Sequence, residues 1–262
     1  METSLARDLM SDEEWAFFER FIVAVRAPNG RKPTDHRPVL DGIFWISRTG
    51  AHWRDLPEEF GKWPSVYRQF RRWTLAVLWE QTMDALNESG AVPHALQMID
   101  STVVRAHHQA AGAKRGTPRQ GFGRSRGGFT TKIHLLVNAA GLPMRTEITA
   151  GQTSDYLGFD LVMADNLPAP SVQLADRSYD ADTIRETMAK RDVLPVIPMR
   201  KSCKKRVGVD RSLYRLRNLV ERCFNKLKNA RRVAIRYDKT AESFLCFIDI
   251  TSIRLWVRHL ST

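Results

Sequence analysis

The chain has 262 residues, enough for one large domain or for a small domain followed by a medium one. Its net charge of +12 and pI of about 10.0 indicate a polyanionic partner. Three cysteines without paired metal-ligand spacing argue against a disulfide framework or a zinc site and indicate a reducing cytosol. Residues 1–10 lack a signal-peptide pattern, and no stretch approaches ~20 apolar residues, so we expect a cytoplasmic protein without a membrane span.

The positive charge is unevenly distributed along the chain. Residues 1–97 hold twelve basic and fourteen acidic side chains, whereas residues 101–146 hold eight basic and no acidic ones. Residues 200–236 hold fourteen basic and two acidic ones. A charge run is usually a solvated face, but an acid-free stretch of 46 residues is harder to explain in that way. The excess charge therefore belongs to two segments in the later part of the chain.

The first part of the chain reads as a small helical domain, residues 1–90. Ser11 and Glu14 form a capping box that opens a helix, and a dense apolar helix follows over 39–46. A third helix begins near Pro64 and carries three basic residues, Arg68, Arg71 and Arg72. These helices allow a helix-turn-helix module that reads DNA. Two alternatives are a plain helical bundle with exposed arginines and, because aromatic residues are abundant, a dimerisation module.

The second part, residues 95–262, alternates strands and helices. Strands are expected over 96–106, 130–139, 144–150, 171–175 and 193–198, and helices over 155–167, 179–190, 214–228 and 241–260. Between the first two strands, residues 109–128 are rich in Gly and Arg, and we expect a basic flexible loop that orders on DNA. This order is that of an α/β, ribonuclease-H-like fold with a mixed sheet and flanking helices.

Two aspartates occupy notable positions in this order. Asp100 lies inside the first strand, where an unpaired charge would be costly. Asp176 follows a strand end, where ligand-binding groups gather in α/β proteins. Asp100 could instead bond a neighbouring backbone group, and Asp176 could be a helix cap or a turn residue.

The expected helix over 214–228 contributes a third acid. On a helical wheel, the apolar residues of this segment form one core face. Beside that face lie four polar residues, Tyr214, Arg217, Glu221 and Lys228. Glu221 is the only acid among many basic residues, which suits a metal ligand beside nucleic acid; the alternative is an ordinary ion pair with Arg217. The predicted core residues are Leu216, Leu219, Val220, Cys223, Phe224 and Leu227.

Together Asp100, Asp176 and Glu221 provide three hard oxygen ligands, spaced 76 and 45 residues apart. Phosphodiester cleavage must activate a water or a 3′-hydroxyl and stabilise the leaving oxygen. Two Mg²⁺ (or Mn²⁺) ions about 3.5–4 Å apart can do both.

The spacing Tyr214, Arg217, Glu221 and Lys228 resembles the signature helix of DDE transposases of bacterial insertion sequences, of the insertion-sequence-five type in the IS4-like superfamily. The string from His52 to Pro57 is similar to the N-terminal domain of the same group, and the similarity extends over nearly the whole chain. One departure is Ser178, where relatives commonly carry Gly.

The resemblance implies an enzyme that binds the terminal inverted repeats of its element, cleaves at the ends and joins them to target DNA. It implies that Asp100, Asp176 and Glu221 are catalytic and hold two metal ions, and that a homodimer acts on double-stranded DNA. The candidate DNA contacts are Tyr214, Arg217, Lys228, Lys132, Arg105, Arg68, Arg71 and Arg72. Two rivals are a ribonuclease-H-like nuclease such as a junction resolvase, and a catalytically inactive, domesticated DNA-binding protein.

Overall fold

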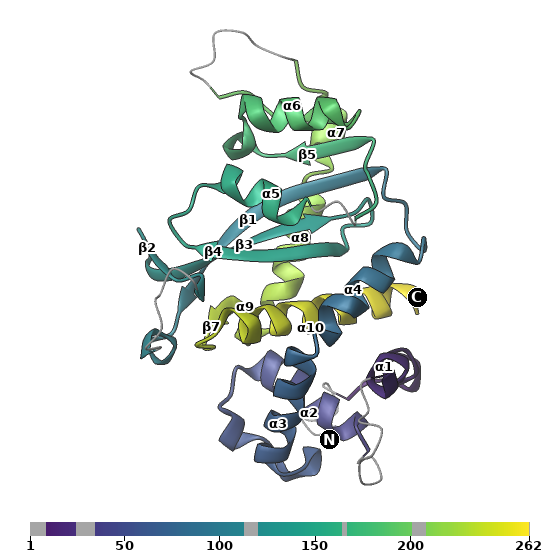
Figure 1. Cartoon of the computed structure of the whole chain (residues 1–262), viewed down its shortest axis with the longest axis vertical. Coiled ribbons are helices and arrows are strands. Elements are labelled where there is room, and N and C mark those ends of the chain that lie inside the picture. Colours follow the sequence, from purple (N-terminus) through teal and green to yellow (C-terminus); the bar gives the residue numbers. More distant parts are fainter. Residues whose placement is uncertain (1–8, 25–34, 113–119, 164–166, 201–207, 262) are drawn as a thin grey trace.

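The computed structural model describes residues 9–24, 35–112, 120–163, 167–200 and 208–261. A sheet with its own helices forms one half of the molecule, and the N-terminal helices form the other (Figure 1). The long C-terminal helix α10 lies between the two halves. None of the described helices combines the length and apolar content needed to cross a membrane.

The N-terminal half is helical, as the sequence predicts. The predicted capping box is present, since the Ser11 backbone N–H donates to Glu14 Oε2 at 3.2 Å and the Glu14 N–H donates to Ser11 Oγ at 3.1 Å. Pro64 stands in the first turn of α3, as expected. The elements are α1 (Asp12–Ala24), α2 (Arg37–Thr49), the 3-10 turns η1 (Trp53–Asp55) and η2 (Glu58–Phe60), α3 (Trp63–Leu75) and α4 (Leu78–Glu88).

The other half is built on a mixed sheet whose main order is β4-β3-β1-β5-β6. β1 pairs antiparallel with β3 and parallel with β5, and the short strands β2 and β7 extend β3 and β1. This is the strand order of the predicted ribonuclease-H-like fold. The strands are β1 (Leu96–Ala106), β2 (Gly123–Ser125), β3 (Gly128–Val137), β4 (Pro143–Ala150), β5 (Val172–Ala175), β6 (Leu194–Val196) and β7 (Ile235–Arg236).

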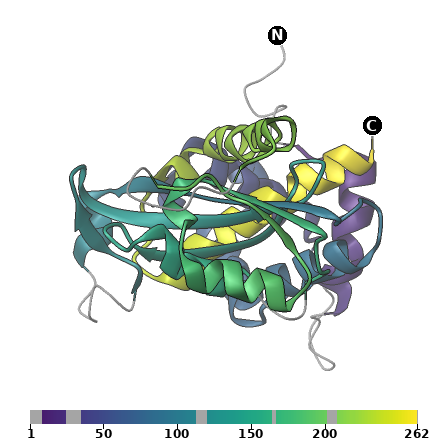
Figure 2. The ribbon, with the colours of Figure 1, turned by 90° about the horizontal axis from the view of Figure 1, so that it is seen from above.

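Helices cover both faces of this sheet (Figure 2). Alternate residues of β1 point to opposite faces: Met98 packs in the cluster that contains α8, whereas Ile99 packs with α5 and α6. The remaining elements are η3 (His108–Gly112), η5 (Asp155–Gly158), α5 (Phe159–Val162), η6 (Arg177–Tyr179), α6 (Asp182–Lys190), α7 (Arg211–Arg215), α8 (Asn218–Lys228), α9 (Arg231–Ala234) and α10 (Ala241–Leu260).

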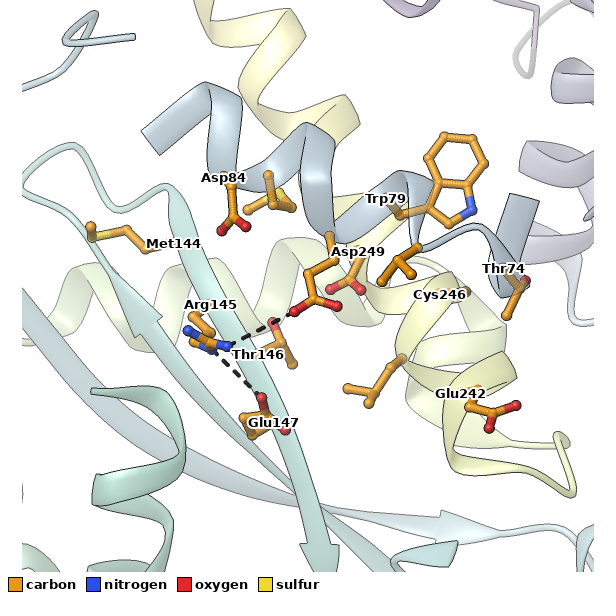
Figure 3. A pocket seen from close by; sticks show the side chains of 14 residues that line it. Thr74, Trp79, Asp84, Met144, Arg145, Thr146, Glu147, Glu242, Cys246 and Asp249 are labelled. Atoms are coloured by element: carbon orange, nitrogen blue, oxygen red, sulfur yellow. Dashed lines mark ion pairs between the residues drawn. The ribbon is translucent and has the colours of Figure 1, made fainter. Parts of the chain in front are cut away.

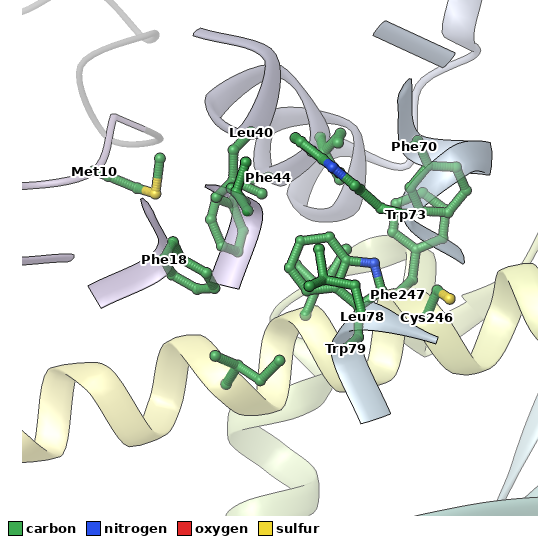
Figure 4. Packing of buried hydrophobic residues seen from close by; sticks show 14 of the residues in the cluster. Met10, Phe18, Leu40, Phe44, Phe70, Trp73, Leu78, Trp79, Cys246 and Phe247 are labelled. Atoms are coloured by element: carbon green, nitrogen blue, oxygen red, sulfur yellow. The ribbon is translucent and has the colours of Figure 1, made fainter. Parts of the chain in front are cut away.

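The N-terminal helices share one hydrophobic core with α10 (Figure 4). Phe70 of α3 stacks on Phe247 of α10 with ring centroids 4.8 Å apart, and Trp73 meets Trp79 edge to face at 5.7 Å. Glu14 of α1 also forms ion pairs with Arg254 and Arg258 of α10. Because residues of both regions pack in this one core, the division into a domain over 1–90 and a domain over 95–262 stays a prediction.

The structure corrects two predicted helices. The helix predicted over 214–228 is divided into α7 and α8 by a turn at Leu216 and Arg217, where i→i+3 hydrogen bonds replace the α-helical ones. This tighter winding turns Leu216, a predicted core residue, outward, and it is 40% exposed. The helix predicted over 155–167 reduces to η5 and the single turn α5 within the described residues.

The predicted flexible loop over 109–128 is partly ordered. Its described residues include η3 and β2, and β2 pairs with β3. The Gln120 side chain accepts the Ala241 backbone N–H at 2.7 Å, and Phe122 is buried. Residues 113–119, like the basic stretch 201–207, lie outside the described residues.

Candidate active site

The sheet brings the two predicted aspartates side by side. In the parallel pair of β1 and β5, Ile99 lies opposite Ala175, so Asp100 and Asp176 take adjacent positions on neighbouring strands. Ile99 and Ala175 both lie in the core with α6, so the aspartates point to the other face, toward α8. Two aspartates that are 76 residues apart in the sequence therefore lie next to each other on the same face of the sheet.

Arg217 connects Glu221 to Asp100. Its Nη2 donates to Asp100 Oδ2 at 2.8 Å, and its Nη1 donates to Glu221 Oε1 at 2.6 Å. The ion pair between Arg217 and Glu221, which the sequence offered as the alternative to a metal ligand, is therefore present, but the same guanidinium also holds the strand aspartate. One cation lies between two carboxylates that come from different elements.

Burial and charged neighbours perturb the carboxyl group of Asp100. Burial raises the pKa of Asp100 to about 6; Arg217 and the Ser101 N–H oppose this rise, whereas Asp176 and Glu221 add to it. For Arg217, burial alone would lower the pKa, but Asp100 and Glu221 outweigh burial and raise it. Asp176 and Glu221 therefore lie close enough to Asp100 for their negative charges to act on it.

The other two signature residues lie beside this cluster. The Lys228 Nζ donates to Thr102 Oγ1 of β1 at 2.6 Å and lies 5.9 Å from the Phe224 ring centroid. Burial raises the pKa of the Tyr214 hydroxyl, with Arg217 opposing and Asp176 and Asp100 adding to the rise. The edge predicted from the helical wheel therefore faces β1, although a turn interrupts the helix.

A fourth acid, Asp155, lies behind the aspartates. Its Oδ1 accepts Lys132 Nζ at 2.5 Å and Ser101 Oγ at 2.7 Å. The Ser178 hydroxyl also acts on Asp155, so two serines link Asp155 to the segments of Asp100 and Asp176. The sequence alone did not single out Asp155, because its role depends on contacts with residues far away in the chain.

Lys132 requires a correction, because it was predicted to contact DNA. Its side chain is 11% exposed, and its ammonium donates to Asp155 and to the Thr153 carbonyl, both at 2.5 Å. A buried ammonium with two protein acceptors is not available to a phosphate at the surface. Lys132 instead holds Asp155 in place beneath the acidic cluster.

The turn after Asp176 accommodates Ser178 without strain. Asp176 caps η6, and its Oδ1 accepts the Ser178 backbone N–H at 2.7 Å. The Ser178 hydroxyl donates to the same oxygen. Ser178 is not among the described residues with positive φ, so the turn does not need the glycine that the resemblance led us to expect.

The remaining predicted DNA contacts lie outside this cluster. Arg105 is exposed at the end of β1. On α3, Arg68 and Arg72 are exposed, whereas Arg71 is half-buried and its Nη1 donates to Ser243 Oγ of α10 at 3.0 Å. The structure therefore brings Tyr214, Arg217 and Lys228 to the acids but leaves the α3 arginines in the other half of the molecule.

The donor set fits a divalent cation in its chemistry. Asp100 Oδ2 and Glu221 Oε1 are hard oxygen ligands, and they already share a positive group. However, within the described ranges no three His, Cys, Asp or Glu side chains are grouped closely enough to hold a metal. The Arg217 guanidinium occupies the space between Asp100 and Glu221, so a shared cation there requires Arg217 to move.

The chain belongs to the family of transposases that carry a DDE domain. The profile described as "Transposase DDE domain" matches residues 93–248, and the one described as "Putative transposase of IS4/5 family" matches residues 10–83. Both halves of the molecule therefore match transposase families, as the resemblance predicted.

Individual relatives agree with this assignment. The chain is 35% identical over 134 residues to the "Putative transposase for insertion sequence element IS6501" of Brucella ovis, covering 50% of this chain and 100% of the relative. It is 28% identical over 131 residues to the "Putative transposase for insertion sequence element IS402" of Burkholderia cepacia, covering 46% and 59%.

Solved structures show weaker likeness. A synaptic complex of the piggyBac transposase with hairpin DNA matches with a TM-score of 0.46 and 13% identity, covering 100% of this chain and 69% of that one. The Mos1 strand transfer complex matches with a TM-score of 0.27 and 14% identity, covering 81% and 85%.

Proposed function

We propose that this protein binds the terminal inverted repeats of an insertion sequence, cleaves the DNA at their ends and transfers the strands to target DNA, acting as a homodimer. The observation that supports the proposal most directly is the meeting of Asp100, Asp176 and Glu221 on one face of the sheet. Arg217 joins two of the three carboxylates at that face.

Asp100, Asp176 and Glu221 would hold two Mg²⁺ or Mn²⁺ ions. When bound, the ions would supply Lewis-acid activation of the attacking oxygen and stabilise the leaving oxygen. Glu221 is the most accessible of the three, with a side chain 54% exposed, so the site opens at the surface, where a duplex can approach.

The neighbouring residues have separate tasks in this proposal. Arg217 lies between Asp100 and Glu221, and Lys228 lies beside them on Thr102; both cations would position backbone phosphates of the cleaved end. Ser101 and Ser178 fix one oxygen of Asp100 and of Asp176. The second oxygen of Asp100 is bound by Arg217, so it becomes available to another ligand when Arg217 moves. Asp155 and Lys132 form a neutral pair that supports both serines from behind.

The proposal can be tested with a duplex that carries the element's own end. The DNA flanking the gene should supply short inverted repeats and a direct duplication. We expect the protein to nick this duplex at the end of the repeat and to join it to a second duplex, in Mg²⁺ or Mn²⁺ but not in EDTA. Cleavage without joining would favour a ribonuclease-H-like nuclease, and repeat binding without cleavage in any divalent metal would indicate an inactive DNA-binding protein.

A further inference from the structure

A polar cavity of about 420 Å³ lies where the N-terminal helices meet the end of β1. Its walls come from the segment after α2, from η3, and from α9 and the residues after β7. Figure 1 shows α9 and β7 on the side of the sheet that faces the N-terminal helices. The lining residues are Gly50, His52, Trp53, Gln109, Arg232, Tyr237 and Lys239.

The lining is basic. The guanidinium of Arg232 is already hydrogen-bonded within the protein. Its Nε and Nη2 donate to the Asp238 carboxylate at 3.2 and 3.0 Å, and its Nη1 donates to the Ala51 carbonyl at 2.9 Å. That pairing neutralises Asp238, a buried acid beside the cavity. His52 and Lys239 are exposed, so their donors remain at the cavity.

Two further imidazoles flank the cavity. The ring centroids of His107 and His108 are 4.0 Å apart, and His107 lies 5.0 Å from Tyr237. Desolvation, and then His108 and His52, lower the pKa of His107, so both of these imidazoles lie close enough to act on His107. A concave surface with several N–H donors and a neutralised acid suits an anion such as a phosphate.

The cavity lies in line with the acidic cluster along β1. Asp100 and His107 are seven residues apart, which is about 23 Å at about 3.3 Å per residue of extended strand. Lys228 meets Thr102 along this path, and Arg231 of α9 is exposed beside the cavity, next to Gly50. Since duplex DNA rises about 3.4 Å per base pair, the cavity is about seven base pairs from the acids.

The junction around the cavity is closely packed. Gly50 has φ +69°, and a Cβ there would lie 3.2 Å from Arg231 Cβ and 3.3 Å from Tyr237 Cε2. This close approach seats the end of α2 directly on α9. Because the N-terminal helices also share a core with α10, they are fixed at a set distance from the acids.

We propose that this cavity binds backbone phosphates of the transposon end, about seven base pairs inside the cleaved bond. The inference rests on the proposed function and deepens it by assigning the path of the end DNA. The transposon side is chosen over the target because η1, which lines the cavity, packs on α3: Trp53 and Tyr67 ring centroids are 5.2 Å apart. The cavity therefore adjoins α3, the helix predicted to read the inverted repeat, on which Arg68 is exposed.

The first test compares two exposed lysines in the full-length protein without divalent metal. Lys239→Ala removes one charge at the cavity, and Lys190→Ala removes one at the end of α6, on the far side of the sheet. We expect Lys239→Ala to weaken binding of the end duplex about three- to tenfold and to reduce the salt slope by about 0.9, the value for one phosphate contact. Lys190→Ala should change neither quantity. Equal binding by the two variants would overturn the proposal.

The second test locates the phosphate. Neutral methylphosphonates placed six to eight base pairs from the cut, on the transposon side, should weaken binding by the wild type. The same substitutions should have little further effect on His52→Ala/Lys239→Ala, and interference only on the target side, or at no position, would refute the assignment. Both tests measure binding without metal, so they are independent of the cleavage assay that decides the proposed function. Equal thermal unfolding midpoints would confirm that the variants are folded.

Discussion

The molecule holds two acidic clusters of opposite character. At the candidate active site, every acid faces a donor: Arg217 holds Asp100 and Glu221, and Ser178 holds Asp176. A cavity of about 190 Å³ between α4, β4 and α10 is lined by five acids and one arginine (Figure 3). Arg145 lies 3.6 Å from Glu147 and 4.0 Å from Glu80. The other acids of this cavity are Asp84, Glu242 and Asp249.

The difference shows why concavity alone would identify the wrong site in this protein. The cavity in Figure 3 is concave, but its five acids outnumber its one arginine, and this excess negative charge would repel a phosphodiester. The candidate active site opens at the surface and has basic neighbours. A duplex cannot enter a small pocket, so its enzyme needs acids on an accessible face with cations around them.

The largest expected effect is on DNA cleavage, which should require the acids of the candidate active site but not those of the acidic cavity. Asp100→Asn, Asp176→Asn or Glu221→Gln should each reduce DNA cleavage by about 10³-fold or more, since each removes a carboxylate ligand. DNA binding should persist, because positive charge is kept. Glu147→Gln and Asp249→Asn serve as matched controls in the other cluster and should leave cleavage within about twofold. The measurement is nicking of the end duplex in Mn²⁺; efficient cleavage by any of the first three variants would contradict the assignment.

The second prediction concerns α10, which carries Asp249 toward the acidic cavity and Phe247 into the shared core. Phe247→Ala should cost about 3–5 kcal/mol of unfolding free energy, because it removes the stacking on Phe70 and leaves a void. The loss should appear in one cooperative transition, measured by circular dichroism and by tryptophan fluorescence. Two separate transitions would show that the N-terminal helices are an independent unit. Leu260→Ala, at an exposed position of the same helix, is the control.

The third prediction concerns Arg217, the cation between Asp100 and Glu221. Arg217→Ala should raise Mn²⁺ affinity in the absence of DNA by about tenfold, because the guanidinium no longer competes for Asp100 and Glu221. Mn²⁺ binding can be followed by water-proton relaxation. The gain should disappear in Arg217→Ala/Asp100→Asn, which distinguishes this site from binding in the acidic cavity. Unchanged affinity in the single variant would show that Arg217 does not occupy the metal position.

The smallest expected effect is a pH-dependent gain in the stability of the protein when the charge of Asp249 in the acidic cavity is removed. Burial raises the pKa of Asp249, and Glu147 and Glu80 raise it further. The folded state therefore binds more protons than the unfolded state above about pH 4, and stability falls as pH rises through that window. Asp249→Asn should remove this loss and stabilise the protein by about 0.5–2 kcal/mol at pH 7 but not at pH 3. Urea unfolding at the two pH values would detect the difference, and an equal gain at both would exclude the charge explanation.

The sequence by itself determined the strand and helix order, the family and the three candidate acids. These features depend on local patterns: the apolar run around Asp100, the strand before Asp176 and the spacing from Tyr214 to Lys228. Each pattern reflects short-range periodicity or fixed offsets, which a single chain displays directly. The capping box at Ser11 and the start of α3 near Pro64 were predictable for the same reason.

Only the tertiary structure decided which charges are free and which are paired. The sequence could not show that Lys132 is buried against Asp155, that Arg217 joins Asp100 to Glu221, or that Arg71 turns toward α10. These partners are far apart in the chain, and their meeting depends on sheet register and helix packing. The shared core of α10 and the cavity beside Lys239 arise likewise from contacts between distant segments, whose geometry no local pattern records.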